Sequence, residues 1–151
     1  MKVGIIVGST RPNRLAPKVA LWIHELASRR RDAEFEIVDL ADFQLPYLDE
    51  PLPPVAGHYT KEHTLHWARK VASFDAFIIV TPEYNYSVPP ALKTALGFLY
   101  AEWNNKAAAF VSYGAALGVR AVEHLRGIMA QLQIADVGGQ VGLSLFDGFD
   151  E

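Results

Sequence analysis

Residues Phe77-Ile78-Ile79-Val80 and the loop that follows them, Thr81-Pro82-Glu83-Tyr84-Asn85-Tyr86-Ser87-Val88-Pro89, decide the fold. The apolar run predicts a buried strand, and a helical stripe at i, i+3, i+4 and i+7 follows the loop, formed by Leu92, Ala95, Leu96 and Leu99. The two prolines fix the ends of this strand-to-helix loop. A rigid loop with aromatic faces and hydrogen-bonding edges suits a planar heteroaromatic ligand. The alternative is a connector whose tyrosines pack on a neighbouring surface.

Strand signals alternate with helix signals along the whole chain. Besides the strand at 75–80, strands are expected at 2–8, 35–40, 107–111 and 141–145, the last loosened at its start by Gly138-Gly139. Apolar stripes predict three more helices. The first buries Leu15, Val19, Trp22, Ile23 and Leu26, and the second, capped by Thr60, buries Leu65, Ala68 and Val71. The third buries Ala121, Leu125, Ile128 and Leu132. Residues 42–58 and 112–118 read as loops. This order predicts one α/β domain over residues 1–151, a doubly wound parallel sheet.

Composition narrows the class of protein. The chain has 151 residues, a net charge of −3 and no cysteine. The charge gives no reason to expect a nucleic acid partner, and no apolar run reaches the length that spans a membrane. The lack of cysteine and of a signal peptide is consistent with a cytoplasmic protein.

The polar loops follow the first, third and fourth strands. In a five-stranded sheet of order 2-1-3-4-5 these strands are neighbours, and ligands bind at the carboxyl ends where the chain reverses its direction of growth. The three loops should therefore meet in one crevice.

The first of these loops opens a helix and predicts an anion site. Free N–H groups and the positive end of the helix dipole attract anions, Ser9 and Asn13 add donors, and Arg11 and Arg14 add charge. The loop matches neither a P-loop nor a dinucleotide fingerprint, so a monophosphate is the expected ligand. The alternative is an ordinary capped turn with solvated arginines.

Three segments together resemble a known family. Gly8-Ser9-Thr10-Arg11, Thr81–Pro89 and Leu92-Lys93 are similar to the NAD(P)H-dependent FMN reductases, which have the flavodoxin-like fold and include quinone, chromate and azo-dye reductases. The resemblance implies that the turn from Ser9 to Ala16 holds the FMN phosphate, that Pro82 to Tyr86 lie along the isoalloxazine ring, and that 112–114 approach its pyrimidine side. The implied cofactor-binding residues are Ser9, Arg11, Asn13, Arg14, Leu15, Ala16, Pro82, Glu83, Tyr84, Asn85, Tyr86, Ser112, Tyr113 and Gly114.

The resemblance also implies an activity. Hydride would pass from NADPH or NADH through FMN to a small acceptor such as a quinone or free flavin, with ping-pong kinetics, in a homodimer or homotetramer. Tyr84 and Tyr86 are candidates for stacking on the ring or substrate. A flavodoxin-type electron carrier and a flavin-free binding scaffold remain alternatives. No side chain is named as catalytic: Glu83 could be a general base, but a carboxylate that bonds loop amides or a partner subunit is the favoured interpretation. No metal is expected, since His58, His63 and His66 read as surface residues.

Two departures from the family pattern carry expectations. Many members have serine and asparagine near positions 14 and 16, where this chain has Arg14 and Ala16, and Arg14 could substitute by charge. The family's last helix has no counterpart before Glu151. Because the first and last helices cover one sheet face together, an apolar patch is expected there, to be buried by another subunit or by further chain.

Overall fold

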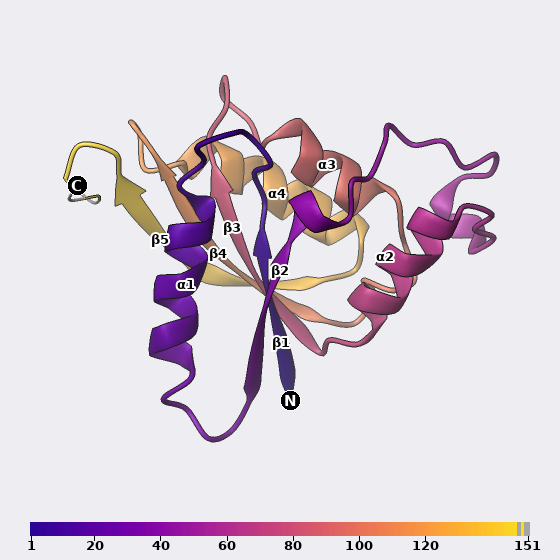
Figure 1. Ribbon diagram of the computed structural model, residues 1–151, viewed down its shortest axis with the longest axis horizontal. Coiled ribbons are helices and arrows are strands. Elements are labelled where there is room, and N and C mark those ends of the chain that lie inside the picture. The colour runs from indigo at the N-terminus through magenta and orange to yellow at the C-terminus, as the bar shows by residue number, and fades with distance from the viewer. Residues whose placement is uncertain (148, 150–151) are drawn as a thin grey trace.

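One sheet of five parallel strands runs in the order β2-β1-β3-β4-β5, as the sequence predicts (Figure 1). The computed structural model describes residues 1–147 and 149. The strands are β1 (Lys2–Val7), β2 (Glu34–Asp39), β3 (Ala76–Pro82), β4 (Ala107–Gly114) and β5 (Ala135–Ser144). The helices are α1 (Ala16–Ala27), α2 (Glu62–Ala72), α3 (Pro90–Gly97) and α4 (Val119–Gln131). Within the described residues, no helix combines the length and the apolarity that a membrane crossing needs.

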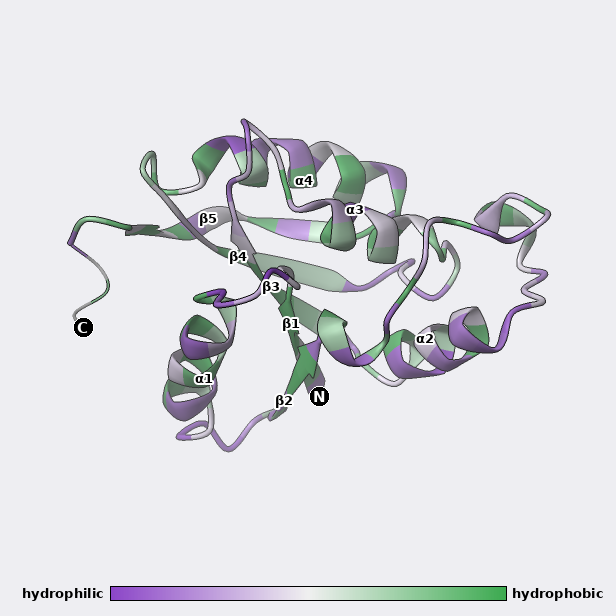
Figure 2. Cartoon of the chain, turned by 45° about the horizontal axis from the view of Figure 1, so that its top comes forward, coloured by the Kyte–Doolittle hydropathy of each residue, from purple (hydrophilic) through white to green (hydrophobic). Residues whose placement is uncertain are grey.

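Strand β1 is apolar on both faces because helices cover both sides of the sheet. Ile5 and Val7 face α1, whereas Ile6 faces the core formed with α2, α3 and α4. Figure 2 shows the hydrophobic strands at the centre of the molecule and hydrophilic segments in the loops around them.

The α2–α3–α4 face holds the larger core. Trp67 and Trp103 are buried there with their ring centroids 6.0 Å apart in an edge-to-face arrangement. The Trp67 indole N–H donates to the carbonyl of Ala95 at 2.9 Å, so α2 and α3 are joined by a buried hydrogen bond.

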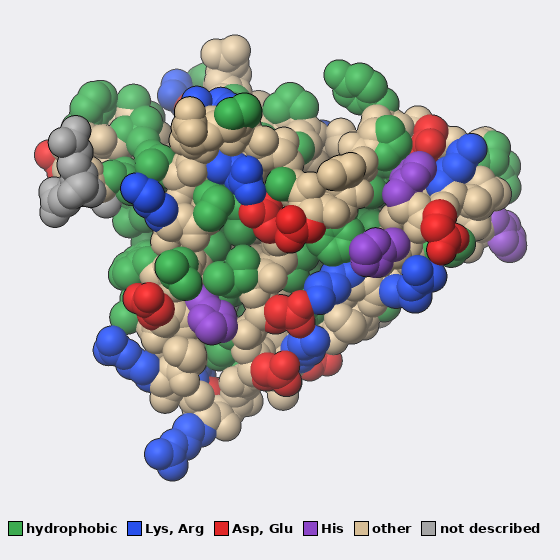
Figure 3. All heavy atoms as spheres, in the orientation of Figure 1, with side chains coloured by type: hydrophobic (Ala, Val, Ile, Leu, Met, Phe, Trp, Pro, Cys, Tyr) green, Lys and Arg blue, Asp and Glu red, His purple; other side chains and the backbone are tan. Residues whose placement is uncertain are grey.

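The opposite face is covered, among the described residues, by α1 alone. Val19 and Ile23 are buried as predicted, but Trp22 is 44 % exposed. A cleft of about 320 Å³ lies between α1 and the end of β5, lined by Lys18, Val19, Trp22, Leu143 and Phe149. Figure 3 shows apolar side chains at the surface beside α1. The expected apolar patch is therefore confirmed.

Several local predictions need correction. Thr60 does not cap α2: Lys61 is the N-cap, and Thr60 donates its hydroxyl to Glu50 at 2.9 Å. Glu50, ten residues before Thr60, also accepts the N–H groups of Thr60 and Lys61, so a distant carboxylate takes the capping role. The segment expected as a plain loop over 42–58 contains a 3₁₀ turn at Pro54–Ala56 and adjoins another at Leu40–Asp42. Trp22 and Leu26, predicted inward, lie at the surface.

The edge strand β5 begins earlier than predicted and contains an irregularity. Ala108 pairs with Asp136 and Phe110 with Gln140, so β5 has extra residues, including the two glycines at 138–139, opposite Ala109. Arg126 of α4 pairs with Asp136 and donates to the carbonyls of residues 137 and 138 at 2.8 and 2.9 Å. The irregularity is therefore fixed by a side chain from the adjacent helix.

Candidate functional site

The loop after β1 begins with a glycine that has no room for a side chain and with a buried serine. A Cβ on Gly8 would lie 2.7 Å from the carbonyl oxygen of Val80. The same oxygen accepts the Gly8 N–H at 2.9 Å. The next residue, Ser9, is fully buried although its side chain is polar. The close approach of β1 and β3 thus places a buried hydroxyl at the carboxyl edge of the sheet.

The start of α1 leaves backbone donors available to a ligand. Its N-cap, Leu15, makes no side-chain capping bond, Pro17 lies in the first turn, and that turn contains no acidic residue. Asn13 has a positive φ of 57°, which turns the chain into the helix. Uncapped N–H groups and the helix dipole together favour an anion at this position.

The two arginines of this loop have different surroundings. Arg14 forms an ion pair with Asp39, at the end of β2, with 2.5 Å between Nη2 and Oδ2. Asp39 thus engages one Nη group, whereas Arg14 Nε is buried with no hydrogen-bond partner among the described residues, and the expected phosphate contact of Arg14 stays a prediction. Arg11 is exposed, and its Nε donates to the Tyr84 hydroxyl at 3.3 Å.

The loop after β3 meets the first loop directly. The hydroxyls of Tyr84 and Ser9 share a hydrogen bond of 2.8 Å although the residues are 75 positions apart. Both loops lie at the upper edge of the sheet in Figure 1, opposite the N-terminus. The predicted meeting of these two segments in one place is therefore observed.

The residues Tyr84 to Ser87 form a tight turn with an unusual backbone. Tyr84 N–H donates to Ser87 O at 2.8 Å and Ser87 N–H to Tyr84 O at 3.1 Å. Asn85 and Tyr86 occupy the central positions with φ of 46° and 76°. Side chains at positive φ cost about 1–2 kcal/mol each, less for asparagine, so the surrounding contacts must hold the turn in place.

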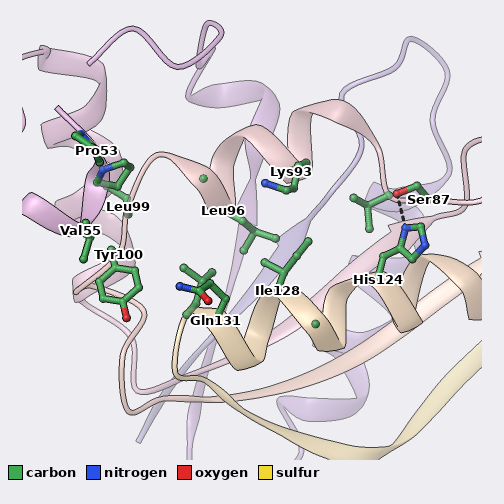
Figure 4. A pocket seen from close by; sticks show the side chains of 15 residues that line it. Pro53, Val55, Ser87, Lys93, Leu96, Leu99, Tyr100, His124, Ile128 and Gln131 are labelled. Atoms are coloured by element: carbon green, nitrogen blue, oxygen red, sulfur yellow. Dashed lines mark hydrogen bonds between the residues drawn. The ribbon is translucent and has the colours of Figure 1, made fainter. Parts of the chain in front are cut away.

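Those contacts come from α4. The Glu83 carboxylate, only 7 % exposed, forms an ion pair with Arg120 and accepts the Arg120 N–H at 3.1 Å. The Arg120 guanidinium lies 4.6 Å from the centroid of Tyr86, and His124 shares a 2.9 Å hydrogen bond with the Ser87 hydroxyl (Figure 4). Glu83 is thus a carboxylate held by one backbone amide and one guanidinium of α4, and not by amides of its own loop. Sequence reasoning missed Arg120 and His124, for which the only signal is the need of a buried carboxylate for a partner.

The third predicted segment, residues 112–114, belongs to β4 and not to a loop. Glu83 N–H donates to Tyr113 O at 3.2 Å, and the pairing with β3 continues to Pro82–Tyr113, which explains the longer strand. Ser112 donates its hydroxyl to Leu117 O at 2.7 Å, and a Cβ on Gly114 would lie 3.5 Å from the Cβ of Glu83.

The Tyr113 side chain turns away from Glu83, toward α1. Its ring packs with Val19, Val111 and Phe149, and burial raises the pKa of its phenol. The structure thus brings the loops after β1 and β3 and the end of β4 together at the carboxyl edge of the sheet, and the Tyr113 side chain lies beneath the start of α1.

The histidines near α2 are engaged by neighbouring side chains. His63 pairs with Asp49 at 2.9 Å, and the ring of His66 lies 5.1 Å from that of Phe43. Over residues 1–147 and 149, no group of three His, Asp or Glu side chains could hold a metal ion.

Comparison with known proteins gives one consistent result. The profile of the NADPH-dependent FMN reductases matches residues 1–147. An NAD(P)H-dependent FMN reductase of Schizosaccharomyces pombe is 42 % identical over 135 residues, which are 88 % of this chain and 68 % of that protein. A 2-hydroxy-1,4-benzoquinone reductase of a Burkholderia species is 33 % identical over 144 residues, 89 % of this chain and 73 % of the relative.

The fold comparison agrees. The flavoenzyme NAD(P)H:acceptor oxidoreductase FerB of Paracoccus denitrificans superposes with a TM-score of 0.74 at 25 % identity, covering 91 % of this chain and 75 % of FerB. The match of the family profile over nearly the whole sequence, together with these relatives, shows that the chain belongs to the NADPH-dependent FMN reductase family.

Proposed function

We propose that this protein is an FMN-dependent oxidoreductase that passes hydride from NAD(P)H to a quinone, a free flavin or a similar small acceptor. The observation that carries the proposal is the contact between Ser9 and Tyr84. It joins the loop at 9–14, which suits a phosphate (the phosphate-type loop), to the loop at 82–87, which suits a flat ring (the ring-type loop), at the carboxyl edge of the sheet. Relatives named as FMN reductases and quinone reductases support the same activity.

The first loop fits the phosphate of FMN. The buried Ser9 hydroxyl, the exposed Arg11 guanidinium and the uncapped N-terminus of α1 form a set of donors without an acidic residue in the first helical turn. Asn13, Leu15 and Ala16 contribute backbone positions around this set. Arg14 fits less well, because Asp39 already holds it.

The other two segments fit a flat ring with polar edges. The Asn85–Tyr86 turn presents backbone N–H groups at positive φ, and the Pro82–Glu83 and Tyr113–Gly114 backbones lie side by side. FMN, when bound, supplies the acceptance and donation of hydride. The protein's own part is to orient the ring and to place donors where negative charge develops. Glu83 positions the loop in this scheme, because its carboxylate is held by Arg120.

Ping-pong kinetics follow if NAD(P)H and the acceptor bind in turn at the same exposed face of the flavin ring. The test is steady-state oxidation of NADH and of NADPH, with added FMN and a benzoquinone as acceptor. Parallel double-reciprocal lines support the scheme, and intersecting lines contradict the shared face. An FMN-loaded protein that oxidises neither nucleotide would instead indicate a flavodoxin-type carrier, and a protein that takes up no FMN would indicate a binding scaffold.

We further propose that the protein is a homo-oligomer that assembles through the groove between α3 and α4 (Figure 4). The groove has a volume of about 830 Å³ and a mostly apolar lining, which includes Val55, Leu96 and Ile128. Gly97 and Gly127 face it from the two helices, and the Cβ built on Gly127 meets no atom within 4 Å. A helix of a second copy can therefore approach closely without disturbing the protomer.

The groove proposal is tested by Gly127→Arg, with Gly139→Arg as the control. Both glycines have open space around them and negative or extended φ, so neither change strains its own protomer. Sedimentation equilibrium should give a monomer for Gly127→Arg and the wild-type mass for Gly139→Arg. A Gly127→Arg variant that keeps the wild-type mass would overturn assembly through this groove.

A further inference from the structure

The hydroxyl of Tyr84 lies within the first loop, although the residue belongs to the turn after β3. It shares a 2.8 Å hydrogen bond with the fully buried Ser9 hydroxyl and accepts from Arg11 Nε at 3.3 Å. The main chain of the same residue closes the turn through its two hydrogen bonds with Ser87. Tyr84 is thus attached to the phosphate-type loop by its side chain and to the ring-type turn by its backbone.

The chemistry of a phenol lets this hydroxyl serve a phosphate without moving the ring. It has one proton to donate and two lone pairs that accept. With Arg11 and the Ser9 hydroxyl donating to its two lone pairs, an arrangement that the 2.8 Å contact allows, the phenolic proton can turn toward an acceptor. A phosphate monoester offers only acceptor oxygens around its charged group, so beside Ser9 and Arg11 it would take the proton of Tyr84 in a charge-assisted bond.

The turn needs such an anchor. Asn85 and Tyr86 occupy a conformation that side chains disfavour, with φ of 46° and 76°. A hydroxyl fixed by an anion would restrain the first residue of this turn and lower the population of relaxed alternatives.

We propose that Tyr84 is a phosphate ligand that couples the phosphate site to the Asn85–Tyr86 turn, so that binding of the phosphate orders the part of the loop that receives the ring. This inference rests on the proposed use of FMN. It assigns Tyr84 a role in selecting the phosphorylated flavin over riboflavin, in place of a role in stacking.

The test compares Tyr84→Phe with Tyr86→Phe. Both variants lose one phenolic oxygen from the same turn, but only the Tyr84 oxygen contacts Ser9 and Arg11. The ligand-free proteins are titrated with FMN and with riboflavin, and the quenching of flavin fluorescence gives a Kd for each. The ratio of the two values cancels any effect of a variant on the ring alone.

The preference for FMN over riboflavin should fall about tenfold in Tyr84→Phe, the usual effect of losing one hydrogen bond to a charged group, and should stay at the wild-type value in Tyr86→Phe. A preference unchanged in Tyr84→Phe, or reduced equally in both variants, overturns the phosphate role. A wild-type protein that binds neither flavin overturns the proposed function and this inference with it, so the two failures are distinguishable.

The coupling is tested without flavin by hydrogen exchange in the presence of inorganic phosphate. In the wild type, phosphate should slow exchange of the peptide that contains residues 84–87, and in Tyr84→Phe it should slow only the peptide that contains Ser9 and Arg11. Equal protection of the turn in both proteins would show that the two sites are not coupled through this side chain. Thermal unfolding of each variant confirms that it is folded before either measurement.

Discussion

Replacing Arg120 with methionine removes one guanidinium that holds two residues of the candidate flavin loop. Arg120 forms an ion pair with the buried Glu83 carboxylate and lies 4.6 Å from the ring centroid of Tyr86. Methionine keeps the unbranched shape and leaves the residue 120 backbone N–H, which donates to Glu83 at 3.1 Å. The change therefore isolates the guanidinium from the rest of the helix start.

The magnitude follows from the burial of the two groups. Removing one partner of a buried ion pair costs about 3–5 kcal/mol. The Arg120 side chain is 38 % exposed and the backbone donor remains, so solvent screening reduces this to about 2 kcal/mol. Loss of the cation–π contact at the exposed Tyr86 ring adds about 0.5–1 kcal/mol. We expect the free energy of unfolding to fall by about 2.5–3 kcal/mol.

Urea unfolding of Arg120→Met, Glu83→Gln and the double variant measures this energy and its origin. If the ion pair carries the effect, the double variant loses about 1.5 kcal/mol less than the sum of the two single losses. Arg30→Met is the control, because its ion pair with Asp32 is well exposed, and it should change stability little. Additive single losses, within about 0.5 kcal/mol, would refute the reasoning.

Four further outcomes are expected. Arg11→Ala should weaken FMN retention, measured by dialysis and absorbance, while circular dichroism stays unchanged; equal retention would refute its phosphate role. Gly8→Ala should lower stability by about 2–3 kcal/mol in urea, since the new Cβ meets Val80 O at 2.7 Å, whereas Gly139→Ala should be tolerated. Desolvation raises the pKa of Glu50, but the hydrogen bonds from Thr60 and Lys61 outweigh it and lower this pKa from 4.5 to about 2. The stabilisation by Glu50 is therefore complete above pH 4.5 and lost as pH falls toward 2, so the urea curves of wild type and Glu50→Gln should converge there. A dye that fluoresces in apolar surroundings should bind beside α1 and lose most of its signal in Trp22→Lys; an unchanged signal would place the dye elsewhere.

The fold was predictable because its main signals are local. Apolar runs such as 77–80 mark strands buried on both faces, and the alternation with helices leaves few ways to order a parallel sheet. The meeting of Ser9 with the loop at 82–86 followed from that order, since the carboxyl ends of neighbouring strands share one edge. The apolar patch beside α1 was expected from the comparison with the family pattern, in which a last helix shares that sheet face with the first.

Three of the unpredicted contacts depend on partners that are distant in the sequence. Glu50 replaces Thr60 at the start of α2, Asp39 pairs with Arg14, and Arg120 holds Glu83. Local pattern identifies each of these residues as polar but does not indicate its partner. The length of β4 was missed for a related reason, because pairing with β3 extends a strand through residues whose composition favours a loop.

The irregularity in β5 has a consequence for the protein at high concentration. A parallel sheet exposes unpaired carbonyls along its outer strand, and these can recruit a strand of another molecule into a growing aggregate. In this protein the guanidinium of Arg126 already occupies the carbonyls of Val137 and Gly138, and the extra residues distort the rim at that point. Two carbonyls of the outer strand are thereby closed to strand addition, which opposes aggregation during synthesis and storage.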